Sequence, residues 1–258
     1  MPRNIVFQKR CKAGQALEME GNMVYGVILA GGIGSRMNCS EKPKQFLNVG
    51  EKPIIIHTIE KFILIRNFEK ILVLCPEDWI EYTDEMIEKH IPRRGDVVVL
   101  AGGKTRNETV MNAVEYIENN YVLDEKTVIV THDAVRPFVT TRILKDNIKA
   151  MEKCDACDTV IPATDTIVES TDGAFISQIP NRKFLYQGQT PQTFKAKKLK
   201  KLYGELSESE KDILTDAAKI FTIKGEKVCL VNGETYNIKI TYPYDLTVAE
   251  SLIKNDIK

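Results

Sequence analysis

From Met23 onward, short apolar runs rich in β-branched residues alternate with longer amphipathic segments. The apolar runs are 24–30, 70–75, 96–101 and 127–131, and the segments with helical periodicity are 53–65, 77–90, 106–119 and 141–153. Runs that are almost wholly apolar are typical of strands covered on both faces. Strands and helices that alternate at this spacing predict an α/β fold built on a doubly wound, mostly parallel sheet.

Three polar or glycine-rich loops follow the expected strands. They are residues 31–44, 102–107 and 132–137. Open α/β sheets bind ligands at the carboxyl ends of their strands, so these loops are expected to lie together. The sequence therefore predicts one site at this edge of the sheet.

The alternation changes after Thr159. Short β-prone runs fill residues 159–190, and Asp172-Gly173 is a hairpin signal among them. We expect a β-arm at about 163–188 that leaves the main sheet, and a second subunit to cover its edges. Beyond it we expect helices within 194–222, strands at 227–231 and 237–241, and a closing helix at 243–254.

The ends and the bulk composition limit the domain organisation and the partners. Residues 1–22 are polar and without a clear period, so we expect a flexible N-terminal extension before a single domain of residues 23–258. Lys+Arg and Asp+Glu number 36 each, so no overall charge favours nucleic acid or an acidic membrane. No apolar run is long enough for a signal peptide or a membrane span, and a cytoplasmic location is expected.

The six cysteines are expected to be reduced thiols. A chain of this length without a secretion signal seldom carries a disulfide framework. Cys154-Asp-Ala-Cys157 has the spacing of a redox or half-zinc motif, but a second pair of ligands is missing. We expect no special role for this pair.

The loop after the first strand carries Gly31, Gly32 and Gly34, followed by Arg36 and Lys44. Glycines directly after a strand let backbone N–H groups approach phosphate oxygens, and two cations nearby would bind the same phosphates. The Walker pattern GxxxxGK[ST] is absent, and Met37 replaces the last glycine of a Rossmann GxGxxG. The loop is therefore interpreted as a phosphate cradle of another kind.

Residues 29–45 resemble the signature of the sugar-nucleotide pyrophosphorylase and cytidylyltransferase superfamily. GKTRNET (103–109), HDAVRP (132–137), QTPQ (189–192) and NIKIT (237–241) resemble motifs of the IspD-like cytidylyltransferases. The resemblance covers about residues 23–254. HDAVRPF, YQGQTPQTF and YNIKIT are most similar to the ribitol-5-phosphate branch of that family, and a methylerythritol-phosphate acceptor is the alternative.

The resemblance implies that a phosphate oxygen of D-ribitol 5-phosphate attacks the α-phosphorus of CTP, giving CDP-ribitol and pyrophosphate. It implies that Arg36 and Lys44 are catalytic, because fixed cations stabilise the charge that builds on the α-phosphate. The residues implied to contact the nucleotide are Leu29, Ala30, Gly31, Gly32, Gly103, Lys104, Thr105, Arg106, Asn107, Glu108 and Thr109.

The acceptor and the metal have candidate ligands elsewhere in the chain. Asp133 ends a core strand, where a carboxylate suits Mg²⁺ shared with triphosphate oxygens; a helix-capping role is the alternative. The resemblance implies that Arg182 and Lys239 bind the acceptor phosphate. Because Arg182 falls on the arm, it also implies a homodimer with shared sites. The roles of His132 and Arg136 stay open.

A rival interpretation from another class is a non-catalytic nucleotide-binding module on the same fold, since fold alone does not establish catalysis. A decayed site would lack some of Arg36, Lys44, Asp133, Arg182 and Lys239, and all five are present. The sequence therefore favours an enzyme.

Overall fold

The computed structural model describes residues 22–32, 42–92 and 95–255. The N-terminal extension expected at 1–22 lies outside the described residues except for Asn22, and Arg36 lies outside them as well.

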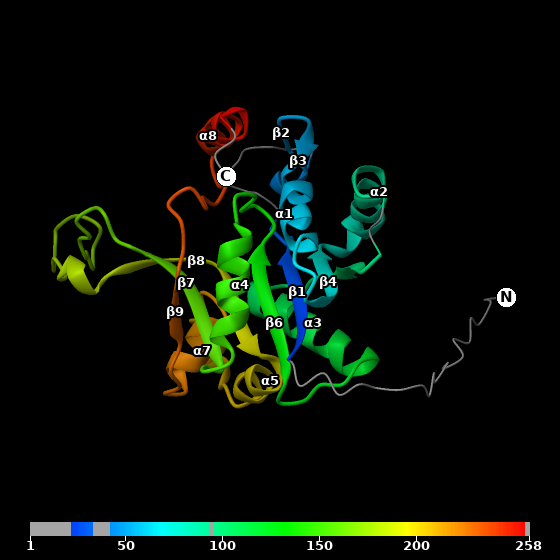
Figure 1. Ribbon diagram of the computed structural model, residues 1–258. Helices are drawn as coiled ribbons and strands as arrows, with labels where there is room; N and C mark the ends of the chain where they lie inside the picture. The colour runs from blue at the N-terminus through cyan, green and yellow to red at the C-terminus, as the bar shows by residue number, and fades with distance from the viewer. Residues whose placement is uncertain (1–21, 33–41, 93–94, 256–258) are drawn as a thin grey trace.

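A seven-stranded sheet forms the centre of the molecule, with helices on both faces (Figure 1). Its order is β5-β4-β1-β6-β8-β7-β9. Neighbours β5, β4, β1 and β6 are parallel, β8 is antiparallel to both β6 and β7, and β9 is parallel to β7. The prediction of a doubly wound, mostly parallel α/β sheet is confirmed. The strands are β1 (Met23–Leu29), β4 (Phe68–Cys75), β5 (Val97–Ala101), β6 (Thr127–Asp133), β7 (Ala156–Pro162), β8 (Tyr186–Lys195) and β9 (Cys229–Asn232); a separate hairpin pairs β2 (Asn48–Val49) with β3 (Lys52–Pro53).

Two apolar clusters cover the two faces of the sheet. Successive residues of β1 point to opposite faces, so Val24 and Ile28 pack in one cluster and Tyr25 and Val27 in the other. Helices α1, α2 and α4 cover the first face, and α3, α5 and α7 the second. Within the described residues, no helix is both long enough and apolar enough to cross a membrane. The helices are α1 (Ile54–Ile63), α2 (Ile80–His90), α3 (Arg106–Asn120), α4 (Thr141–Ala150), α5 (Ala196–Gly204), α6 (Glu208–Asp212), α7 (Ala218–Ile223) and α8 (Pro243–Lys254), with short 3₁₀ turns η2 (Lys44–Phe46), η3 (Glu77–Trp79) and η4 (Arg182–Phe184).

One predicted strand is absent from the structure. Residues 237–241 form no strand, although the closing helix α8 matches its predicted range. The backbone of this segment bonds to loops instead: the amide of Ile240 donates to the carbonyl of Val135 at 2.9 Å, and Arg136 Nη1 donates to the carbonyl of Asn237 at 2.8 Å. Its β-prone residues therefore lie in a loop that crosses the end of β6.

The central strand β8 is longer than the sequence indicated. It runs through Gln189, Thr190 and Pro191, and this polar, proline-containing stretch has no sequence signal for a strand. The pairing of β7 with β8 shifts between Asp158 and Val160, opposite this stretch. Proline cannot donate to a ladder and is tolerated at such an irregularity.

The segment between β7 and β8 leaves the sheet in the range predicted for the arm. Residues 164–179 are exposed, and Figure 1 shows the segment projecting at the left of the view. An isolated bridge joins Glu169 to Gln178, and Gly173 turns the chain with a φ of +74° between them. The chain thus reverses near Asp172-Gly173 without forming strands, and both the β-arm and its role in dimerisation stay predictions.

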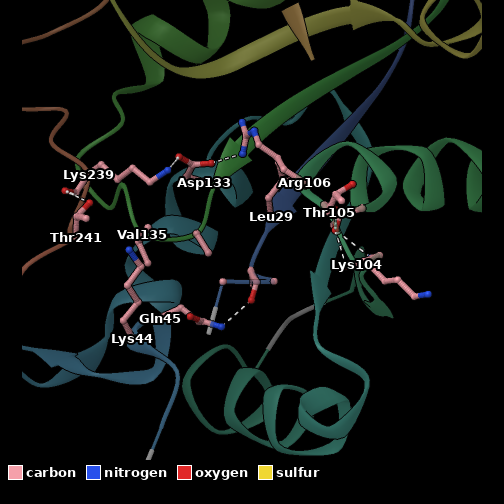
Figure 2. Close-up of a pocket in the computed structure, with 16 residues that line it drawn as sticks. Leu29, Lys44, Gln45, Lys104, Thr105, Arg106, Asp133, Val135, Lys239 and Thr241 are labelled. Atoms are coloured by element: carbon pink, nitrogen blue, oxygen red, sulfur yellow. Dashed lines mark hydrogen bonds and ion pairs between the residues drawn. The ribbon is translucent and has the colours of Figure 1, made fainter. Parts of the chain in front are cut away.

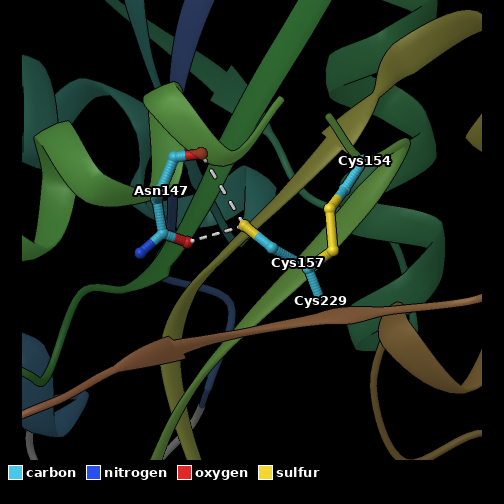
Figure 3. Close-up of a disulfide and its surroundings, with 4 residues drawn as sticks. All are labelled: Asn147, Cys154, Cys157 and Cys229. Carbon is cyan, nitrogen blue, oxygen red and sulfur yellow. Dashed lines mark hydrogen bonds between the residues drawn. A yellow bond between two sulfur atoms is a disulfide. The ribbon is translucent and has the colours of Figure 1, made fainter. Parts of the chain in front are cut away.

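The expectation that the cysteines are reduced is wrong for two of them. Cys154 and Cys229 form a disulfide, with their Cα atoms 6.4 Å apart (Figure 3). Cys157, the other member of the CxxC pair, stays a buried thiol whose Sγ lies 3.3 Å from Asn147 Oδ1. The partner of Cys154 is 75 residues away in sequence, and only the pairing of β7 with β9 brings it near.

Removal of this disulfide is expected to lower the free energy of unfolding by about 2–4 kcal/mol, because it closes a long loop of the unfolded chain. Cys154→Ser, Cys229→Ser and the double variant should unfold at the same lowered urea midpoint, since each breaks the same bond. Dithiothreitol should move the wild type to that midpoint and leave the variants unchanged. A wild-type midpoint that is insensitive to dithiothreitol would contradict the prediction.

Candidate active site

A cavity of about 390 Å³ opens where β1 and β6 end (Figure 2). The loops after β1, β5 and β6 meet there, as the position of the three polar loops predicted. The lining residues are Leu29, Ala30, Gly31, Gly32, Lys44, Gln45, Gly103, Lys104, Thr105, Arg106, Thr109, Asp133, Ala134, Val135, Lys239 and Thr241.

The end of β1 forms one wall through its backbone. The carbonyl of Ala30 accepts a hydrogen bond from Gln45 Nε2 at 2.6 Å, and the carbonyl of Leu29 accepts one from the amide of Ala134 at 3.0 Å. Gly31 and Gly32, which follow, are exposed and line the cavity. These residues lie where the sequence placed the phosphate cradle.

The loop after β5 is held against the start of α3. Thr105 caps α3 in a capping box with Glu108, and Thr109 Oγ1 accepts from the amide of Gly103 at 3.0 Å. A Cβ at Gly103 would lie 2.4 Å from that of Glu108, so only glycine allows this close approach. Of the seven residues of this loop predicted to contact the nucleotide, five line the cavity, Gly103, Lys104, Thr105, Arg106 and Thr109, and Asn107 and Glu108 do not. The nucleotide contacts themselves stay a prediction.

Asp133, the last residue of β6, is surrounded by three cations. Its carboxylate forms ion pairs with Arg106 and with Lys239 Nζ at 2.8 Å (Figure 2). A third ion pair joins it to Arg136 Nε at 3.6 Å. Burial would raise the pKa of this carboxyl, but Arg106 and Lys239 outweigh that effect and hold the pKa well below its usual range. Asp133 therefore pairs with cations and does not cap a helix. Together with Arg106, Arg136 and Lys239 it forms a cluster of net positive charge, here called the charged centre.

His132 lies beneath this centre and has no access to solvent. Its Nε2 is 3.0 Å from the carbonyl of Arg136 and its Nδ1 is 2.9 Å from Thr190 Oγ1, which itself accepts from the amide of Asp133. Burial lowers the pKa of His132 to about 4, so the ring is neutral at neutral pH. His132, whose role the sequence left open, therefore supports the backbone of the site and does not line the cavity.

Lys44, on η2, is 8% exposed and donates from Nζ to the carbonyl of Ile240 at 2.9 Å. It therefore joins the nucleotide side of the cavity to residues 237–241. Its predicted partner Arg36 lies outside the described residues.

The two residues predicted to bind the acceptor phosphate lie apart. Lys239 lines the cavity, whereas Arg182 lies in η4 on the arm and donates to the carbonyl of Thr164 at 2.6 Å. The cavity of this chain is thus built without Arg182.

Four lining residues were not predicted: Gln45, Ala134, Val135 and Thr241. All four fall within motifs quoted above, at 29–45, 132–137 and 237–241, so membership of a motif was the available signal.

The residues present suit a metal shared with a ligand. Asp133 is the one carboxylate among the lining residues, and the described ranges contain no group of three or more His, Cys, Asp or Glu side chains placed to hold a metal. Both oxygens of this carboxylate already form ion pairs, so Mg²⁺ fits here only when phosphate oxygens enter with it and offset the positive charge, and an all-protein cage does not fit.

Asp158 on β7 is a second carboxylate near this region, and it is half-buried. It accepts from Gln192 Nε2 at 3.1 Å, and burial raises its pKa to about 6. The folded-state pKa lies above the unfolded one, so the folded protein holds the proton more tightly than the unfolded chain does. The resulting stability is fully present below about pH 4 and is lost as the pH rises through about 6, where the half-buried carboxyl ionises.

Asp158→Asn is therefore expected to raise the free energy of unfolding by about 1–2 kcal/mol at pH 8, a gain that should vanish near pH 4. Urea unfolding at both pH values measures the difference. Asp212→Asn, at an exposed position, is the matched control and should change stability by less than about 0.5 kcal/mol. Equal effects of the two substitutions at pH 8 would contradict the assignment.

Comparisons with known proteins agree with this geometry. A family model described as 2-C-methyl-D-erythritol 4-phosphate cytidylyltransferase, IspD, matches residues 24–255. A ribitol-5-phosphate cytidylyltransferase of Streptococcus pneumoniae serotype 2, strain D39, is 51% identical over 235 residues, which cover 91% of this chain and 100% of the relative. The protein of the same name from strain R6 matches with the same identity and coverage.

Solved structures share the fold. The 4-diphosphocytidyl-2C-methyl-D-erythritol synthase of Anaerococcus prevotii DSM 20548 superposes with a TM-score of 0.76 at 26% identity, covering 91% of this chain and 97% of that one. For the 2-C-methyl-D-erythritol 4-phosphate cytidylyltransferase of Francisella tularensis the TM-score is 0.74 at 26% identity, with 89% and 99% covered. With the family model matching nearly the whole described domain, and with the cavity at the switch edge of the same sheet, the chain belongs to the IspD family of cytidylyltransferases.

Proposed function

We propose that this chain transfers the cytidylyl group of CTP to D-ribitol 5-phosphate and releases pyrophosphate. The observation that carries the proposal is the 51% identity, over the full length of the relative, to a ribitol-5-phosphate cytidylyltransferase. The cavity supports it, because Lys44, Lys104, Arg106 and Lys239 line it and Asp133 is the one carboxylate among its described lining residues. Such a lining attracts polyanionic substrates.

In the proposed reaction a phosphate oxygen of the acceptor forms a bond to the α-phosphorus as the bond to the β-phosphate oxygen breaks. The attacking phosphate is already anionic, so no strong general base is needed. Negative charge grows on the α-phosphate, and Lys44, together with Arg36, is assigned to stabilise it. Residues 29–32 and 103–106, with Thr109, are assigned to the nucleotide.

Asp133 would hold Mg²⁺ together with triphosphate oxygens. The bound metal would neutralise phosphate charge and orient the oxygens around the α-phosphorus. Arg106 and Lys239 already lie against Asp133, so they are within reach of phosphates that enter beside it.

The acceptor phosphate is assigned to Lys239 and to Arg182 of a second copy of the chain. Arg182 lies on the arm and does not line the cavity of its own chain. The arm also exposes large apolar side chains, which an exchange between two subunits would bury: Ile167, Val168, Phe175, Ile176, Ile179 and Phe184. We therefore propose a homodimer that completes each site in trans.

Mixing two inactive variants tests this shared site. Lys44→Ala and Arg182→Ala are dissociated together and allowed to reassociate. If Arg182 acts in trans, half of the random dimers contain one intact site, so the mixture should recover about a quarter of wild-type activity. If Arg182 acts within its own chain, no dimer has an intact site and activity stays at background. An active monomer in solution would also refute the shared site.

The alternative acceptor is 2-C-methyl-D-erythritol 4-phosphate, which the name of the matching family model favours. Side-by-side turnover with CTP separates the two, and kcat/KM is expected to favour D-ribitol 5-phosphate by at least about 10²-fold. A preference for the methylerythritol substrate would overturn the proposed acceptor and leave the cytidylyltransferase assignment intact. Because CTP is the donor, we place the reaction in the cytoplasm. There CDP-ribitol would supply ribitol phosphate to a polymer such as teichoic acid or capsule.

A further inference from the structure

Lys239 lies on a loop that has no strand or helix of its own, residues 233–241, here named the acceptor loop. A lysine on such a loop binds phosphate well only if the backbone beneath it is fixed, because its long side chain is flexible. We propose that Gln189, Gly233 and Asn237 form an interlock that positions Lys239 for the acceptor phosphate. This inference rests on the proposed function.

Asn237 fixes the middle of the acceptor loop. It has no exposed surface, and its Nδ2 donates to the carbonyl of Thr190 at 2.9 Å and to Gln189 Oε1 at 3.2 Å. Its own carbonyl accepts from Arg136 Nη1 at 2.8 Å. Two residues further on, Lys239 Nζ lies 2.8 Å from Asp133 Oδ2. The amide of Asn237 thus ties the loop to β8 close to the lysine.

Gln189 fixes the start of the same loop. It is 7% exposed, and its Nε2 donates to the carbonyl of Glu234 at 2.8 Å while its Oε1 accepts from Asn237. A Cβ at Gly233 would lie 2.3 Å from Gln189 Oε1 and 3.0 Å from Thr159 Cγ2. The glutamine side chain therefore packs directly on the Gly233 backbone, and a Cβ at this position would displace Gln189 Oε1 from its place beside Asn237.

The interlock also relates the loop to the charged centre. Thr190, next to Gln189 on β8, accepts from the amide of Asp133 through Oγ1 at 3.1 Å and from Asn237 through its carbonyl. One short piece of β8 thereby holds both members of the Asp133–Lys239 pair. Displacing the loop would move Lys239 away from Asp133 and remove the carbonyl of Ile240 from Lys44 Nζ, which lowers kcat, while the backbone wall at the ends of β1 and β5 stays in place.

Substitutions in the interlock are expected to weaken the binding of the acceptor and not that of CTP. Gly233→Ala and Asn237→Ala should raise the KM for D-ribitol 5-phosphate about 10-fold or more, and the KM for CTP should stay within about threefold of wild type. Gly204→Ala is the matched control, because a Cβ there meets nothing within 4 Å, and it should leave both constants unchanged. Gln189→Met, which keeps the length of the side chain and removes its hydrogen bonds, is a second route to the same result.

Combining Gln189→Met with Asn237→Ala should raise the acceptor KM by less than the product of the single effects, because both act on one interlock. The inference is overturned if the folded variants keep an acceptor KM within about twofold of wild type, or if the KM for CTP rises as much as that for the acceptor. Failure of the proposed function is distinguishable. In that case the wild type does not turn over D-ribitol 5-phosphate, and the same variants are then compared with methylerythritol 4-phosphate.

Discussion

Asp133→Asn is expected to lower kcat/KM by at least about 10³-fold and the free energy of unfolding by about 3 kcal/mol. The substitution keeps the shape of the side chain and removes its charge, which leaves Arg106, Arg136 and Lys239 close together without their common partner. Repulsion among the cations destabilises the fold, and the proposed metal loses its protein ligand. Steady-state kinetics and urea unfolding measure the two effects separately.

Asp96→Asn is the matched control for this substitution. Asp96 also forms an ion pair, with Lys70 Nζ at 2.6 Å, but its side chain is 65% exposed. An exposed pair contributes at most about 1 kcal/mol, so this variant should stay active and nearly as stable as wild type. If Asp133→Asn behaved like this control, Asp133 would not be the centre of the site.

Lys44→Ala is expected to lower kcat about 10²–10³-fold, the usual cost of removing one fixed group that stabilises charge in the transition state. The KM for CTP should change much less, because the charge on the α-phosphate grows chiefly after binding. Pyrophosphate release in the presence of both substrates measures kcat. Circular dichroism checks the fold, because Lys44 is buried and bonds to the acceptor loop.

Lys42→Ala is the matched control for Lys44→Ala. Lys42 is two residues away and exposed, with its Nζ 5.6 Å from the centre of the Tyr82 ring. Its removal should leave kcat within about twofold of wild type, since it does not line the cavity. Pyrophosphate release that survives Lys44→Ala unchanged would contradict the catalytic role assigned to Lys44.

Much of the fold could be predicted from the sequence because its signals are local. The apolar runs that became β1, β4, β5 and β6 depend on residues adjacent in the chain, as does the helical periodicity of α3 and α8. Parallel strands end at one edge of the sheet, so the loops after them also met as expected. Gly31, Lys44 and Asp133 lie together at the cavity for this reason.

The errors occur where distant segments decide the structure. The strand β8 passes through Pro191 because β6 and β7 flank it on both sides. Cys229 meets Cys154 because β9 pairs with β7. Residues 237–241 have β-prone side chains, yet the loops around them take their backbone hydrogen bonds.

The sequence by itself determined the α/β class, the edge of the sheet that carries the site, and most of the residues that line it. Only the tertiary structure decided how those residues are paired. Arg106, Arg136 and Lys239 come from three separate segments and meet at Asp133, and the hydrogen bond between Gln189 and Asn237 ties β8 to the segment that carries Lys239. Strand and helix preferences act over neighbouring residues, whereas ion pairs and buried hydrogen bonds depend on the packing of the whole sheet.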